Sequence, residues 1–220
     1  MSTASARATF DHLVIAAASL AEGTAWVEDR LGVPSGGGGV HAFMGTHNAL
    51  WRLGDAYIEV IAIDPAAPGP DRPRWLSLDA PETKARIAAR PRLITWQIRP
   101  NRPLDDAVAA MAARGIDTGP PLDAARDDLV WRLTVRGDGA LALGGLFPVM
   151  IEWRAGDRLP PQRLPETPLA LERIEIAGAP GSLAPALADL GADGLAHIGE
   201  AGEPALRAHL DTPRGPVVLD

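Results

Sequence analysis

Three short apolar segments with related sequences constrain the fold of this chain more than any other feature. They begin near Phe10, Leu93 and Leu171, and each precedes a stretch with the apolar spacing of a helix. One polar position differs among them and is occupied by His12, Thr95 and Arg173 in turn. Self-similarity of this kind indicates a scaffold built from repeated units. The variable position marks where each unit can carry different chemistry.

The first unit is predicted to contain one helix and four strands. Ser19 and Glu22 have the spacing of a helix capping box, and Gly32 is a typical helix end. The glycines Gly36 to Gly39 predict a loop. The expected strands are residues 10–16, 40–44, 47–53 and 57–63. The order of elements is therefore βαβββ.

The other two units follow the same pattern with different completeness. The second is expected to have a strand at 93–98, a helix ending at Gly115, a strand at 129–135 and two strands within 140–153. The third has a strand, a helix at 182–190 and strands near 206–210 and 217–219, so it reads as truncated. Pro-rich joints at 65–73 and 160–168 separate the units. The predicted fold is α+β, with βαβββ modules at 8–66 and 91–155 whose mixed sheets curl, and a partial third module at 169–220.

Several of these segments resemble one known superfamily. The resemblance is carried by the opening strand Phe10–Ile15 and by residues 44–50, 57–65, 131–135 and 212–215. They are similar to the glyoxalase-like branch of the vicinal-oxygen-chelate superfamily, which also contains bleomycin-resistance proteins and dioxygenases. The resemblance implies paired βαβββ modules around a cleft, often with a divalent metal inside. Because the superfamily includes lyases, dioxygenases, epimerases and metal-free binding proteins, the fold alone does not select a function.

The resemblance places metal ligands at His12, Glu59, Thr95 and Glu152. Glu59 and Glu152 each lie in an apolar strand, where a carboxylate must be paired, ligated or solvated. His12, Glu59 and Glu152 would together suit Mn²⁺, Fe²⁺, Ni²⁺, Zn²⁺ or Mg²⁺. Thr95 is a poor ligand where a dioxygenase would need a second histidine, which argues against that activity. An ion pair with Arg52 or Arg132 is the alternative for either glutamate.

Two further groups of residues are candidates for chemistry. His47 and Glu59 could act together as catalytic groups that remove a proton next to a carbonyl. Asn48 follows His47 and is a candidate substrate-binding residue. Three tryptophans in predicted strands are expected to line an apolar cleft, although core packing is the alternative for them: Trp51, Trp96 and Trp131.

Composition limits the partners of the protein. The net charge of −7 and the lack of a basic run argue against nucleic acid, and no apolar stretch is long enough to span a membrane. The absence of cysteine fits a cytoplasmic protein. The predicted function is a glyoxalase-like lyase or isomerase of a small carbonyl compound, with a divalent metal as its cofactor. The alternative is a metal-free protein that binds a small molecule, and a homodimer through the exposed edge of the third unit is a further hypothesis.

Overall fold

The structure is a computed structural model that describes residues 7–156 and 158–220. Its first unit contains β1 (Thr9–Ala16), α1 (Leu20–Leu31), β2 (Gly37–His41), β3 (Thr46–Leu53) and β4 (Ala56–Ile63). The second contains β5 (Arg92–Arg99), α3 (Leu104–Ala113), β6 (Pro121–Arg126), β7 (Leu129–Thr134) and β8 (Val149–Ala155). The third contains β9 (Ala170–Ala177), α5 (Leu183–Asp189), β10 (His197–Ile198), β11 (Ala205–Thr212) and β12 (Gly215–Leu219). Helices α2 (Pro81–Ala89) and α4 (Pro160–Arg163) lie in the connections between units.

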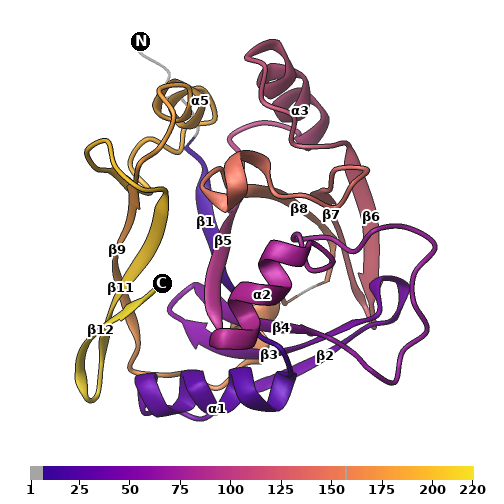
Figure 1. Ribbon diagram of the computed structural model, residues 1–220, viewed down its shortest axis with the longest axis vertical. Helices are drawn as coiled ribbons and strands as arrows, with labels where there is room; N and C mark the ends of the chain where they lie inside the picture. The colour runs from indigo at the N-terminus through magenta and orange to yellow at the C-terminus, as the bar shows by residue number, and fades with distance from the viewer. Residues whose placement is uncertain (1–6, 157) are drawn as a thin grey trace.

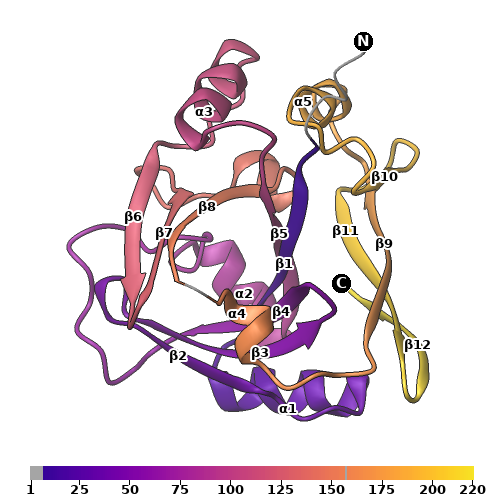
Figure 2. The ribbon, with the colours of Figure 1, turned by 180° about the vertical axis from the view of Figure 1, so that it is seen from behind.

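The first two units share one curled sheet. Its eight strands have the order β2-β3-β4-β1-β5-β8-β7-β6, with β1 antiparallel to β5 at the centre. In each unit the first strand is parallel to the last, because β1 pairs with β4 and β5 pairs with β8. The curl brings the edge strands β2 and β6 toward each other (Figures 1 and 2). The predicted α+β fold of tandem βαβββ modules with curled mixed sheets is confirmed.

Side chains alternate between the two faces of this sheet, and each face has its own apolar core. The outer face carries Leu13, Trp51 and Ile58, which pack in one cluster with residues of α1, α3, α5 and the third unit. The inner face carries Val14 and Ile61, which pack with residues of β7, β8 and α2. Helix α2 accordingly lies within the curl of the sheet (Figure 1). A strand residue therefore belongs either to the outer core or to the interior of the curl.

The third unit has the same element order but a different sheet. Its four strands have the order β10-β9-β11-β12, so β9 lies between β10 and β11. Strand β9 is parallel to the two-residue β10 and antiparallel to β11, with no pairing to the last strand, β12, among the described residues. The third segment thus repeats the first two in sequence order but not in space.

The structure confirms the helix signals of the first unit and corrects the loop predicted for Gly36 to Gly39. The Ser19 hydroxyl accepts a hydrogen bond from the Glu22 amide at 3.2 Å, and Gly32 ends α1 in the left-handed conformation at φ 68°. Residues 37–41 form strand β2 rather than a loop. Glycine is needed there because a Cβ on Gly38 would lie 2.0 Å from the backbone oxygen of Asn48. The glycines thus allow a close approach of two strands.

The second unit also differs from the prediction in its strands. One strand, β8, begins within 140–153 in place of the expected two, and the additional strand is β6, paired with β7 in a hairpin. Residues 142–145 form a short 3₁₀ segment instead, in which Leu143 and Gly144 have positive φ. Helix α2 is not predicted by the sequence patterns either. No helix in the described part of the chain is long and apolar enough to cross a membrane.

Candidate functional site

The inner face of the eight-stranded sheet encloses a pocket lined by residues of both modules. Its volume is ≈ 40 Å³, which is room for about three water molecules. Polar side chains from β1 to β5 face aromatic side chains from β7, β8 and the segment before α2. The lining includes His12, His41, Asn48, Tyr57, Glu59, Trp75, Gln97, Arg126, Trp131, Ile151 and Trp153.

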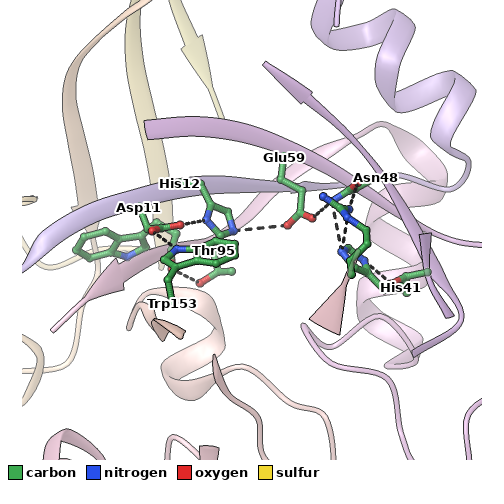
Figure 3. Close-up of polar contacts among 10 residues, drawn as sticks. Asp11, His12, His41, Asn48, Glu59, Thr95 and Trp153 are labelled. Carbon is green, nitrogen blue, oxygen red and sulfur yellow. Dashed lines mark hydrogen bonds and ion pairs between the residues drawn. The ribbon is translucent and has the colours of Figure 1, made fainter. Parts of the chain in front are cut away.

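A chain of polar contacts crosses this pocket (Figure 3). The His12 Nδ1 atom lies 2.7 Å from the Asp11 Oδ1 atom, and its Nε2 atom lies 3.6 Å from the Glu59 Oε2 atom. The Asn48 side-chain amide donates to the other Glu59 oxygen at 2.6 Å. At the far end, Asp11 accepts from the Trp153 Nε1 at 2.9 Å and pairs with Arg99 at 3.2 Å. Asp11 and Glu59, the two carboxylates in this series of contacts, are thus held by several donors although they are buried.

The registers of three neighbouring strands explain why these residues meet. In the parallel pairing of β1 with β4, His12 lies beside Tyr57 and Val14 beside Glu59. The His12 and Tyr57 rings stack with centroids 4.2 Å apart. In the antiparallel pairing of β3 with β4, Asn48 lies beside Ile61, on the same face as Glu59. The alternation of strand residues therefore aims His12, Asn48 and Glu59 into the same space.

The charges of His12 and Glu59 reinforce each other. Burial opposes the charged form of His12, but its bonds to Asp11 and Glu59 outweigh burial and raise its pKa. Burial likewise opposes the charged form of Glu59, yet its contacts with His12, His41 and Asn48 lower its pKa to about 2. Both pKa shifts therefore favour the charged forms, the imidazolium of His12 and the carboxylate of Glu59.

His41 is the second imidazole in the pocket, and it is uncharged. Burial is the main cause that lowers its pKa to about 4, and the charge of Arg126 acts in the same direction. Its Nδ1 lies 3.2 Å from the Thr46 hydroxyl, and its Nε2 lies 3.5 Å from donors on Asn48 and Arg126. The Nε2 atom is thus turned toward these two donors inside the pocket.

The structure brings four of the expected site residues together and separates the others. His12, Asn48, Glu59 and Trp131 line the pocket. Trp51 and Trp96 do not, since both are fully buried in the outer core. Their indole nitrogens donate to the backbone oxygens of Val33 and Leu146. For these two tryptophans the alternative of core packing is the correct one.

His47 points away from Glu59. It precedes Asn48 in β3 and therefore lies on the opposite face of the sheet. Its Nε2 atom is buried without a hydrogen-bond partner among the described residues. The expected pairing of His47 with Glu59 is thus not formed, and His41 is the histidine that reaches the pocket near Glu59. The sequence signal for His41 was its place six residues before His47, on the neighbouring strand.

Glu152 also lies outside the pocket. The Arg132 guanidinium donates to it at 2.9 Å, and Arg154 does so at the same distance. Its neighbours Ile151 and Trp153 face the pocket instead. The expected metal role of Glu152 is therefore replaced by the ion pair with Arg132 that was its alternative.

Gln97 is a site residue that sequence reasoning missed. In the pairing of β1 with β5 it lies opposite His12, whereas Thr95 lies opposite Val14. Thr95 is fully buried and donates to the backbone oxygen of Trp96. The Gln97 Oε1 atom is buried and has no hydrogen-bond partner in the part of the chain described. Gln97 is identified as a site residue because its side-chain oxygen is an unpaired hydrogen-bond acceptor beside His12.

The pocket offers few side chains that could act as metal ligands. Among the described residues there is no group of three or more His, Cys, Asp or Glu side chains arranged to hold a metal. His12 Nε2, Glu59 and the unpaired Gln97 oxygen supply one imidazole, one carboxylate and one amide. Asp11 fixes the His12 tautomer through Nδ1, as carboxylates commonly do behind metal-binding histidines.

Comparisons with solved structures agree with this fold. A hypothetical protein from Staphylococcus aureus matches with TM-score 0.57 and 14% identity, covering 96% of this chain and 84% of that one. Methylmalonyl-CoA epimerase from Mycobacterium tuberculosis has TM-score 0.44 and 17% identity over 70% of this chain and 91% of its own. A 4-hydroxymandelate synthase mutant from Streptomyces coelicolor has TM-score 0.47 and 12% identity, over 96% of this chain and 62% of its own. Of these three similarities, the first supports the fold.

Sequence comparison gives the family. No curated protein matches the chain. The model of the glyoxalase-like domain family matches residues 10–191, which includes both modules of the large sheet and the start of the third unit. This chain therefore belongs to the glyoxalase-like domain family.

Proposed function

We propose that this protein is a lyase or isomerase that acts on a small carbonyl compound, with Glu59 removing the proton next to the carbonyl group. The observation that carries the proposal is the buried pair of His12 and Glu59, which faces a pocket built by both modules. Oriented, perturbed carboxylate and imidazole groups in a cleft are typical of acid–base sites.

Each polar group of the pocket has a role in this proposal. Glu59 is ionised at neutral pH because its pKa is about 2, and Asn48 fixes the direction of its carboxylate. Glu59 then returns the proton to the product, and neutral His41 lies against the Asn48 amide that orients Glu59. Trp75, Trp131 and Trp153 exclude bulk water, which strengthens the electrostatic interactions inside.

His12, Glu59 and Gln97 would hold the divalent metal of the proposed enzyme, drawn from Mn²⁺, Fe²⁺, Ni²⁺, Zn²⁺ and Mg²⁺. The chemistry that such a metal supplies is stabilisation of negative charge on the carbonyl oxygen. His12 binds only in its deprotonated form, so metal and proton compete for its Nε2 atom.

The test is exchange of the hydrogens next to the carbonyl in D₂O, followed by NMR with hydroxyacetone and pyruvate as probes. We expect catalysed exchange with at least one probe, and a loss of about a hundredfold or more in Glu59→Gln. Glu152→Gln is the matched control, because Glu152 lies in an apolar strand but outside the pocket. Exchange that is equally fast in Glu59→Gln and wild type would reject Glu59 as the base.

A metal-free binding protein is the second candidate. The observation in its favour is that Glu59 already has a partner in His12, 3.6 Å away, so its charge can be compensated without a metal. In that case the thermal shift produced by a bound ligand survives a chelator, and no exchange is catalysed at any metal concentration.

A further inference from the structure

Arg126 spans the gap between the two edges of the curled sheet. Strands β2 and β6 are the first and last strands of the sheet order, and no backbone pairing joins them in the described chain. Arg126 is the last residue of β6, and its guanidinium reaches over β2 into the pocket, where it lies 3.5 Å from the His41 Nε2. The Arg126 side chain therefore crosses the gap between the two edge strands of an almost closed barrel.

The glycines of β2 make room for this arginine. A Cβ on Gly39 would lie 2.7 Å from the Arg126 Nη1 atom and 2.9 Å from its Cδ atom. Any larger residue at position 39 would push the guanidinium away from the pocket. Arg126 can thus approach the pocket because Gly39, on the neighbouring strand, has no side chain.

The charge of Arg126 faces the pocket without a carboxylate partner among the described residues. Its Nη1 atom donates to the Asn48 side-chain oxygen at 3.2 Å, and that oxygen also accepts from the Gly39 amide at 2.8 Å. The amide of the same Asn48 donates to Glu59. Asn48 consequently stands between the cation of Arg126 and the anion of Glu59, and both charges remain turned to the pocket.

Arg126 also lines a second cavity outside the first. The outer cavity has a volume of ≈ 210 Å³ and shares Leu50, Leu129 and Pro160 with the inner pocket. An arginine at the boundary can hold an anionic group while the rest of a ligand occupies either side. The inner pocket alone is too small for more than the reacting end of a molecule.

We propose that Arg126 binds the carboxylate of the substrate, so that the substrate is a small carbonyl compound bearing a carboxylate, of the 2-oxo acid class. This inference rests on the proposed function of the same pocket and names its substrate class. A guanidinium binds a carboxylate through two parallel hydrogen bonds, which gives both affinity and orientation. In this arrangement the carboxylate lies at Arg126 and the carbonyl end extends toward Glu59.

The test compares carboxylates with their neutral amides in the intact protein. Pyruvate, 2-oxobutyrate and phenylpyruvate are titrated beside the corresponding amides by calorimetry and tryptophan fluorescence. We expect at least one acid to bind wild type more tightly than its amide. Arg126→Gln then weakens binding of that acid about tenfold or more and leaves binding of the amide unchanged. Arg173→Gln is the matched control, since Arg173 is exposed on the third unit.

Two further variants test the role of Arg126 in carboxylate binding. Gly39→Ala retains the arginine but displaces it, and is expected to weaken binding of the acid as Arg126→Gln does. Glu59→Gln is expected to keep acid binding and lose hydrogen exchange, which separates this inference from the proposed function. If all three acids bind wild type no more tightly than their amides, or if Arg126→Gln binds them as wild type does, the inference is wrong. That result leaves exchange on neutral carbonyl compounds as the separate readout of the proposed function.

Discussion

At the scale of single residues, the site is a buried chain of alternating charges. Arg99, Asp11, His12 and Glu59 follow one another across the interior, and each carboxylate touches at least two donors. Removing one member leaves an uncompensated charge, which is costly in a buried network. Stability and chemistry are therefore coupled in the same side chains.

Asp11→Asn is predicted to destabilise the protein by about 3 kcal/mol, the cost of breaking a buried ion pair. Asp11 is 4% exposed, so solvent does not screen the loss. The pKa of His12 should also fall, because its bond to Asp11 is one of the contacts that raise it. Urea denaturation and NMR titration of His12 measure the two effects. Asp138→Asn, which breaks an exposed pair with Arg136, should change little. Equal stability of Asp11→Asn and wild type would contradict the buried chain.

Stability is predicted to decrease on the acid side because of His41. Its folded pKa of about 4 is below the ordinary value of 6.5, so the unfolded chain binds the proton first. The free energy of unfolding should then fall as the pH falls from 6.5 to 4, by about 3 kcal/mol from this group. Denaturation of His41→Gln over the same range should show a shallower slope, and an unchanged slope would exclude His41 as the cause.

His12 gives the opposite dependence on the alkaline side. Its folded pKa is raised, so its contribution is fully present below 6.5 and is lost as the pH rises through the folded pKa. Wild type should therefore lose stability above pH 6.5, and His12→Gln should not show this loss. Denaturant titrations at several alkaline pH values make the comparison.

At the scale of elements, the faces of the strands decide which residues reach the site. The sequence predicted the opening strand, the capped helix and the apolar character of β3 and β4, because these follow from local patterns. The sequence prediction placed Glu152 in the site because the repeats are aligned there one residue out of register. A shift of one residue moves a strand side chain to the other face of the sheet. Gln97, which lies opposite His12, was missed for the related reason that cross-strand register is not encoded in a single strand. The loop predicted for the glycine run is wrong because these glycines allow a close contact with strand β3, and the local sequence does not show that contact.

Gly38→Ala is predicted to destabilise the protein by about 2 kcal/mol, since the new Cβ would collide with the Asn48 backbone and force β2 away from β3. Gly137→Ala is the control, because a Cβ there meets nothing within 4 Å. Thermal denaturation of both variants checks the difference. If Gly38→Ala melts as wild type does, the close pairing of β2 with β3 is not needed for stability.

At the scale of the whole molecule, one outer core joins the large sheet to the third unit. Leu13, Trp96, Ile176 and Leu206 belong to the same apolar cluster. Leu93 also donates its amide to the backbone oxygen of Asp220. Sequence boundaries between the units therefore do not correspond to independent cores, which local composition could not reveal.

This shared core predicts that the large sheet and the third unit unfold together. Scanning calorimetry should give one transition whose calorimetric and van't Hoff enthalpies agree. Two resolved transitions would show instead that the third unit is a separate folding domain.

The proposed acid–base site of His12 and Glu59 is one that a divalent metal assists. Calorimetric titration of the chelator-treated protein with Mn²⁺, Fe²⁺, Ni²⁺, Zn²⁺ and Mg²⁺, in two buffers of different ionisation enthalpy, tests it most directly. We expect one ion per chain for at least one metal, release of the His12 proton on binding, and loss of binding in His12→Ala and Gln97→Ala. Absence of stoichiometric binding by all five metals, or equal binding by wild type and His12→Ala, would contradict it.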